Sequence, residues 1–139
     1  MANGLILHLH IIGCLLLLLA VVHLDFPRRF SWKIELSSLS LMNRQMIQVH
    51  TFFIALFVGL NGLLFLSMAE ELLQPSPLAR AITIGLLVFW GCRLVFQFLV
   101  YDSALWRGKR FETIMHIIFS LFWSYCLVIF ILLFTIQIQ

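Results

Sequence analysis

Four long runs of hydrophobic residues fill most of the chain, and polar positions are concentrated in the short segments between them. The runs cover residues 5–24, 46–69, 78–101 and 111–136. Each has the roughly 20 residues that a helix needs to cross about 30 Å of hydrocarbon. They are hydrophobic on nearly every side, whereas the helices of a soluble domain keep a polar face. The pattern predicts an all-α integral membrane protein, with a four-transmembrane-helix bundle forming a single domain over residues 1–139.

Prolines and a serine mark where the predicted helices begin and end. Pro75 and Pro77 cannot continue the second helix, which we expect to end near Leu73. Ser76 followed by Pro77 is typical of a helix N-cap with proline at the first helical position. Gly108 interrupts the connection between the third and fourth runs. These breaks predict four separate helices.

The segment between the first two runs, residues 30–43, has a mixed pattern. Hydrophobic and polar residues alternate over residues 30–36, which is the period of an extended chain. Wound as a helix, the same segment would place its hydrophobic residues on two opposite sides. We therefore favour an extended conformation there and leave a helix open. In either form the segment is too hydrophobic to be surrounded by water, so we expect it at the cytoplasmic membrane surface or as a lid over the helix ends.

The charged residues predict an orientation in the membrane. Only 11% of the chain is charged, against about 25% in a typical soluble domain. Seven of the nine lysines and arginines lie in two of the connections: Arg28, Arg29, Lys33, Arg44, Arg107, Lys109 and Arg110. By the positive-inside rule both connections are cytoplasmic and both termini are non-cytoplasmic; in a bacterium the membrane would be the inner one. The net charge of +3 then predicts contact with membrane lipids rather than nucleic acid.

Arg93 lies well inside the third run, about 12 Å from the expected interface at about 1.5 Å per residue. An ionisable side chain at such a depth is costly and usually has a function. Helical side chains lean toward the N-terminus, so Arg93 should point away from the near cytoplasmic water and into the bundle. We expect it to pair there with Glu112, or else with Asp102 or Asn61.

Other polar and aromatic residues fall close to Arg93. Trp90, Arg93, Gln97 and Tyr101 are spaced three, four and four residues apart, so they share one helix face. Histidines of the second and fourth runs lie at a similar expected depth. The pattern predicts one polar layer near the cytoplasmic side, with these candidate ligand-binding residues: Arg93, Gln97, His50, His116, Trp90, Glu112, Tyr101 and Asn61.

Two classes of function fit such a layer. In the first, the protein is an accessory component that binds an amphiphilic ligand, such as a quinone, an isoprenoid or a phospholipid, by its polar head. In the second, it is a structural subunit of a larger membrane complex with no ligand of its own. A further alternative is electron transfer by a b-type haem with His50 and His116 as axial ligands.

The sequence assigns no catalytic residue. It contains no glycine-rich phosphate loop, no C-x-x-C, no G-x-S-x-G and no H-E-x-x-H. The pattern therefore favours a protein that is not an enzyme, and it predicts no metal site beyond the haem alternative.

Overall fold

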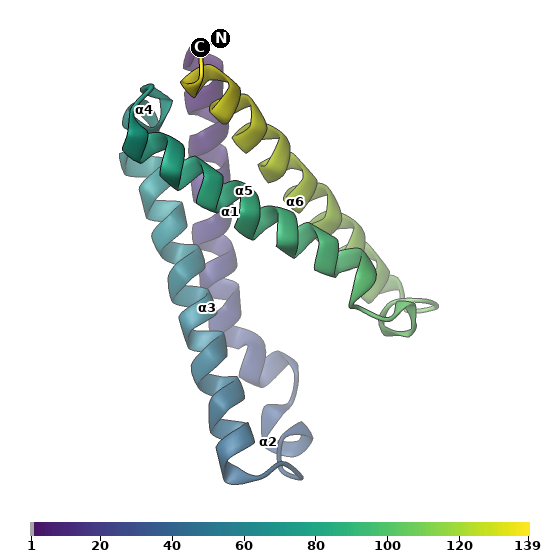
Figure 1. The fold of residues 1–139 in the computed structure, drawn as a ribbon. Helices are drawn as coiled ribbons and strands as arrows, with labels where there is room; N and C mark the ends of the chain where they lie inside the picture. The colour runs from purple at the N-terminus through teal and green to yellow at the C-terminus, as the bar shows by residue number, and fades with distance from the viewer. Residues whose placement is uncertain (1) are drawn as a thin grey trace. The chain divides into compact units, whose positions relative to one another are not determined.

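The computed structural model describes residues 2–139, and its regular structure there is all-helical. Four helices are long and hydrophobic enough to span a membrane: α1 (Ala2–Arg29), α3 (Leu41–Ser67), α5 (Pro77–Leu99) and α6 (Arg110–Gln137). Figure 1 also shows the short elements α2 (Trp32–Glu35) and α4 (Ala69–Leu73), and η1 is a 3₁₀ turn at Ser103–Leu105. The chain is therefore an all-α protein with four candidate membrane-spanning helices.

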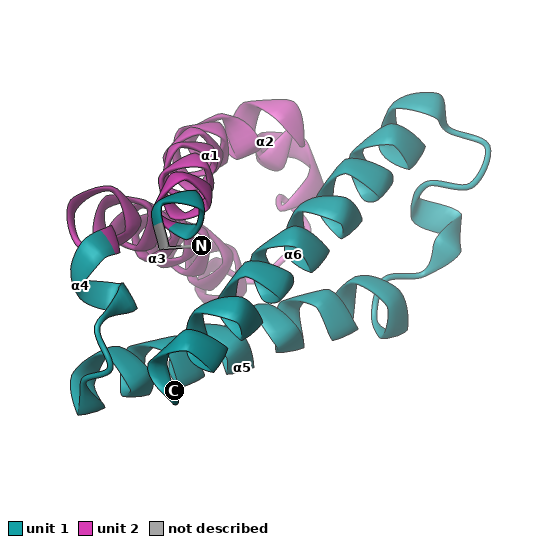
Figure 2. Cartoon of the chain, turned by 90° about the horizontal axis from the view of Figure 1, so that it is seen from above, with its two compact units in different colours: residues 1–5, 70–139 teal, residues 6–69 magenta. Residues whose placement is uncertain are grey.

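The chain divides into two compact units, which Figure 2 shows in different colours. One unit, residues 6–69, contains most of α1 together with α2 and α3. The other, residues 1–5 and 70–139, contains α4, α5, η1 and α6. We refer to them as the α1–α3 unit and the α5–α6 unit.

Glycines bring the two long helices of the α1–α3 unit close together. A Cβ atom added to Gly13 would lie 2.9 Å from the carbonyl oxygen of Gly62. A Cβ atom on Gly62 would lie equally close to the carbonyl oxygen of Gly13. Small residues that allow helix backbones to approach are typical of helix pairs in membranes, where packing drives association. The buried hydrophobic side chains of this unit include Leu9, Ile12, Leu16, Val58 and Phe65.

In the α5–α6 unit the two long helices pack directly against each other. The rings of Trp90 and Trp123 stack between them with centroids 4.9 Å apart. Near the chain's C-terminus, the buried Gln137 donates from Nε2 to the carbonyl oxygen of Leu72 and, at 3.0 Å, to the hydroxyl of Thr83. Neither Thr83 nor Gln137 is among the candidate residues predicted from the sequence.

The predicted start of the third long helix is confirmed. Ser76 is the N-cap of α5, its hydroxyl accepts a hydrogen bond from the Ala79 N–H at 3.1 Å, and Pro77 is the first helical residue. The second long helix differs from its prediction at both ends. It begins at Leu41 because Ser40 caps it, and the backbone breaks at Met68 before α4 continues to Leu73.

The extended conformation favoured for residues 30–36 is wrong. Ser31 adopts the left-handed conformation, with φ 48°, and a helical turn, α2, follows it. The backbone N–H groups of Ile34 and Glu35 donate to the carbonyl oxygen of Ser31 at 2.8 and 3.1 Å. The turn satisfies these backbone groups locally, whereas an extended segment would need a partner strand to do so.

Candidate functional site

Arg93, Gln97 and His116 form a continuous polar chain in the α5–α6 unit. Arg93 Nη1 donates to Gln97 Oε1 at 2.9 Å, and Gln97 Nε2 donates to His116 Nδ1 at 2.8 Å. Gln97 is buried, and the other two side chains are half-buried. Because an amide nitrogen can only donate, the Nδ1 atom of His116 is the acceptor, and neutral His116 carries its proton on Nε2. This row of hydrogen-bonded side chains thus has a donor at each end: the guanidinium of Arg93 and the imidazole N–H of His116.

The direction predicted for the Arg93 side chain is wrong. It extends toward the C-terminal end of α5, where its Cζ atom lies 5.6 Å from the centroid of the Tyr101 ring. The same atom lies 5.1 Å from the centroid of the Trp123 ring on α6. Aromatic faces attract a guanidinium, and this attraction is stronger where water is excluded. Two rings therefore outweigh the backward lean of helical side chains.

The carboxylate partners predicted for Arg93, Glu112 and Asp102, are also wrong. Within residues 2–139, Arg93 makes no ion pair with Glu112 or Asp102, and its side-chain hydrogen bond goes to the amide of Gln97. Glu112 is exposed in the first turn of α6. A neutral acceptor and two aromatic rings hold the guanidinium without the cost of desolvating a second charge.

Two indole N–H groups next to this chain have no hydrogen-bond acceptor among the described residues. Trp90 is 1% exposed and Trp123 is 3% exposed, and the Nε1 atom of each is unpaired there. An unsatisfied buried donor costs about 1–3 kcal/mol. Buried polar groups of native proteins usually have a partner, which is often water or a ligand. We use the name donor cluster for the side chains of Arg93, Gln97, His116, Trp90 and Trp123. Within the described residues, this cluster has more hydrogen-bond donors than acceptors.

Trp106 completes the aromatic wall around His116. Its ring stacks on the imidazole with centroids 3.9 Å apart and planes 8° apart, and Phe98 contacts the imidazole edge-on at 5.9 Å. The Thr113 hydroxyl donates to the carbonyl oxygen of Trp106 at 2.7 Å, which ties the loop to α6. The sequence did not link Trp106 to His116, because the loop path between them follows no helical spacing.

Of the remaining predicted residues, Tyr101 lies beside Arg93, whereas His50 and Asn61 belong to the α1–α3 unit. His50 is exposed, with Nδ1 2.8 Å from the carbonyl oxygen of Met46, and the buried Asn61 donates to the carbonyl oxygen of Phe57 at 2.9 Å. A single polar layer that also includes His50 and Asn61 stays a prediction.

The histidine chemistry bears on the haem alternative. An axial ligand binds iron through an unprotonated ring nitrogen, and its other nitrogen usually donates to an acceptor. In His116 the Nδ1 atom accepts from Gln97, so the neutral ring holds its proton on Nε2, the opposite of that arrangement. Across residues 2–139, no group of three or more His, Cys, Asp or Glu side chains is placed to hold a metal ion.

The chain matches no protein-family model, no curated protein and no solved structure. Its function is therefore inferred from the chemistry of the donor cluster itself.

Proposed function

We propose that this protein is a multi-pass membrane protein that binds the polar head of an amphiphilic ligand at the donor cluster, as an accessory component of a membrane system. The ligand would be a quinone, an isoprenoid or a phospholipid. In this proposal the four long helices span the bilayer as one bundle, with both termini on the non-cytoplasmic side.

The observation that carries the proposal is the imbalance between donors and acceptors. Arg93 has one side-chain hydrogen bond within the described chain, and the indole N–H groups of Trp90 and Trp123 have none. A guanidinium has five N–H donors and no acceptor. Carbonyl or phosphate oxygens would satisfy these groups, and the heads of quinones, isoprenoid phosphates and phospholipids offer such oxygens.

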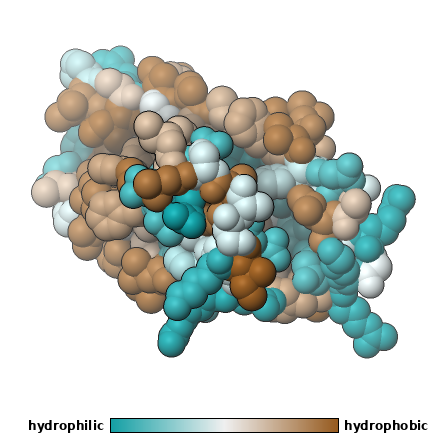
Figure 3. Space-filling model, turned by 90° about the horizontal axis from the view of Figure 1, so that it is seen from below, coloured by the Kyte–Doolittle hydropathy of each residue, from teal (hydrophilic) through white to brown (hydrophobic). Residues whose placement is uncertain are grey.

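The surroundings of the donor cluster suit the tail of such a ligand. Phe98 is 59% exposed, Leu99 is 80% exposed and Ile117 is 51% exposed, so hydrophobic side chains border the cluster on both helices. The view from below shows hydrophilic side chains projecting among hydrophobic ones (Figure 3), a mixture expected at the depth of lipid headgroups. A head at the cluster would therefore leave its tail in hydrocarbon.

Replacing Arg93→Leu tests the proposal, with Arg80→Leu as the matched control in the first turn of the same helix. Each variant is purified in mild detergent and extracted for lipid and quinone mass spectrometry. A hydrogen bond to a charged group contributes about 1.5–3 kcal/mol. We therefore expect Arg93→Leu to retain one amphiphile at about a tenth of the wild-type amount, or less. Arg80→Leu should retain the wild-type amount.

Three outcomes would contradict the proposal. Equal retention in both variants would remove Arg93 from the binding site. A wild-type preparation with no enriched amphiphile and no colour would favour the structural-subunit alternative. A Soret band that disappears in His50→Ala and His116→Ala would favour the haem alternative.

A further inference from the structure

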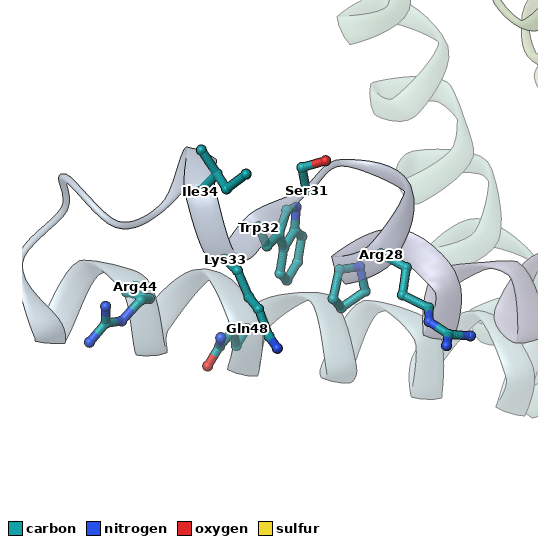
Figure 4. A pocket seen from close by; sticks show the side chains of 8 residues that line it. Arg28, Ser31, Trp32, Lys33, Ile34, Arg44 and Gln48 are labelled. Carbon is teal, nitrogen blue, oxygen red and sulfur yellow. The ribbon is translucent and has the colours of Figure 1, made fainter.

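A second candidate site lies in the α1–α3 unit, beneath the short helix α2. A cavity of about 640 Å³ opens there between the end of α1, α2 and the start of α3. Three of its lining side chains are basic, namely Arg28, Lys33 and Arg44. Figure 4 shows Lys33 extending from α2 across to α3 beside Gln48, with the indole of Trp32 on the same side of α2. We call this hollow the basic cavity.

The basic cavity continues into a hydrophobic groove along α1 and α3. A smaller hollow of about 280 Å³ shares Pro27, Trp32 and Gln48 with the basic cavity. That hollow in turn shares side chains with a groove of about 510 Å³, which is lined by hydrophobic residues and Gly59. The side chains common to both are Leu24, Phe52 and Ala55. The three hollows therefore adjoin one another, from a cationic end to a hydrophobic one.

The hollow of about 280 Å³ forms the passage between the cationic end and the hydrophobic end, and it has few polar groups without a hydrogen-bond partner. His23 Nδ1 lies 2.7 Å from the carbonyl oxygen of Leu19, and the Thr51 hydroxyl donates to the carbonyl oxygen of Ile47 at 2.9 Å. The hydroxyl donor and one ring nitrogen are thus engaged within their own helices. The passage suits the weakly polar region between a headgroup and an acyl chain.

The length of the hydrophobic groove matches one leaflet of a bilayer. From Phe52 to Leu63 the groove follows α3 for about 16 Å, at about 1.5 Å per residue. Half of the hydrocarbon thickness of a bilayer is about 15 Å. An acyl chain in the groove would therefore run from the interface to the midplane.

Exposed hydrophobic side chains next to the basic cavity distinguish a lipid from a free anion. Ile34 is 74% exposed, Met42 is 69% exposed and Phe30 is 54% exposed, all within the segment that surrounds the cavity. A site for a soluble anion gains nothing from these residues, whereas a membrane-embedded site does.

We propose that the α1–α3 unit binds one anionic phospholipid. Its phosphate binds at Lys33, which lies between the outward-pointing side chains of Arg28 and Arg44 in Figure 4, and one acyl chain lies in the groove that leads from the basic cavity to Leu63. Basic pockets on the cytoplasmic side of membrane proteins bind such headgroups, and the cytoplasmic leaflet is rich in anionic lipids. This site is separate from the donor cluster and goes beyond the function proposed for it.

The test is native mass spectrometry of the full-length protein taken from vesicles of equal phosphatidylglycerol and phosphatidylcholine. We expect wild type to retain phosphatidylglycerol selectively. Lys33→Gln and Arg44→Gln should each lower the retained phosphatidylglycerol about fivefold, from the loss of one basic contact. Lys109→Gln removes one positive charge outside the cavity and is the matched control, with retention equal to wild type.

A second pair of variants tests the groove. Val21 lines the groove and is 62% exposed, so Val21→Trp covers the groove without disturbing the core. The neighbouring Val22 is 43% exposed and does not line it, so Val22→Trp is the control. We expect only Val21→Trp to lower phospholipid retention.

Four results would overturn the inference. One is retention that does not distinguish the two lipids. A second is equal loss in Lys109→Gln and Lys33→Gln. A third is displacement of the bound lipid by inorganic phosphate at millimolar concentration, which would indicate an anion site. The fourth is a dimer that carries no phospholipid. A loss of phosphatidylglycerol in Arg93→Leu but not in Arg44→Gln would place the lipid at the donor cluster instead, so the two proposals fail separately.

Discussion

At the scale of single residues, a substitution at Trp123 distinguishes a ligand-binding role of the indole N–H from a packing role of the ring. Trp123→Phe keeps an aromatic ring for Arg93 and for the stack with Trp90 but removes the unpaired N–H. Without ligand, loss of the unsatisfied donor, which costs about 1–3 kcal/mol, should offset the packing lost with the larger ring, so the thermal midpoint should change little. With ligand, loss of one hydrogen bond of about 1 kcal/mol should lower retention about fivefold.

The measurements for Trp123→Phe are the thermal midpoint in delipidated detergent and the amount of copurified amphiphile. Trp123→Leu serves as the comparison, because it removes both the ring and the N–H and should lower both quantities. If Trp123→Phe lowered the thermal midpoint and left retention unchanged, the indole N–H would have a structural role and the donor cluster would lose its main support.

Helical spacing identified part of the donor cluster from the sequence. The spacing of three and four residues placed Arg93, Gln97 and Tyr101 on one face of the predicted helix, and the structure brings them together although α5 ends at Leu99. The direction of the Arg93 side chain could not be predicted in this way. It depends on Trp123, which belongs to α6, and no local pattern fixes which α6 residues meet which residues of α5.

At the scale of helices, the close approach of α1 and α3 yields a stability prediction. In Gly13→Ala the new Cβ would lie 2.9 Å from the carbonyl oxygen of Gly62, which is backbone and cannot move aside alone. We expect Gly13→Ala to destabilise the protein by about 1–3 kcal/mol, as overpacking usually does. The measurement is the unfolding free energy in mixed micelles.

Gly85 provides the matched control for Gly13. It also lies inside a long helix, but a Cβ atom there would meet nothing within 4 Å. Alanine has the higher helix propensity, so Gly85→Ala should be neutral or stabilising by up to about 1 kcal/mol. Destabilisation of equal size in both variants would show that the effect comes from helix propensity or lipid contact and not from the α1–α3 approach.

The long helices were predictable because each satisfies its own backbone hydrogen bonds over a length that the hydrophobic pattern marks. Their ends followed where one side chain sets the boundary, as Ser76 and Pro77 do for α5. The single turn α2 was not predicted because hydrophobic and polar residues alternate over residues 30–36, as they do in a strand. Its formation depends on the left-handed backbone of Ser31, a conformation that few non-glycine residues adopt and that no sequence signal marks here.

At the scale of the whole molecule, the hydrophobic pattern gives four candidate spans, and the distribution of charge gives their expected direction. The direction in which the spans cross the membrane depends on the positive charge of the loops, and the packing of the helices does not reveal it. The arrangement of the four helices as one bundle depends on contacts between side chains distant in sequence. Hydrophobic runs of nearly uniform composition do not specify those contacts, so this part of the prediction requires an experiment.

Cysteine labelling tests the orientation of the spans. Gln74 and Ala104 are exposed and lie in the connections before α5 and before α6. They are better positions than Ser76, whose hydroxyl caps α5, and Gly108, whose φ of +80° disfavours a side chain. In a background with Cys14, Cys92 and Cys126 replaced by alanine, a membrane-impermeant maleimide should label Gln74→Cys in intact cells. Ala104→Cys should react only after permeabilisation, because the positive-inside rule places its basic loop in the cytoplasm.

Ser38→Cys, in the exposed connection between α2 and α3, completes the orientation test. It should behave as Ala104→Cys does, since two spans separate the positions and both connections are basic. Labelling of Gln74→Cys and Ala104→Cys from the same side would mean that α5 does not cross the membrane. The reverse pattern, with only Ala104→Cys labelled in intact cells, would keep four spans but invert them. The basic cavity would then face the outer leaflet, and the anionic phospholipid proposed for it would have to come from that side.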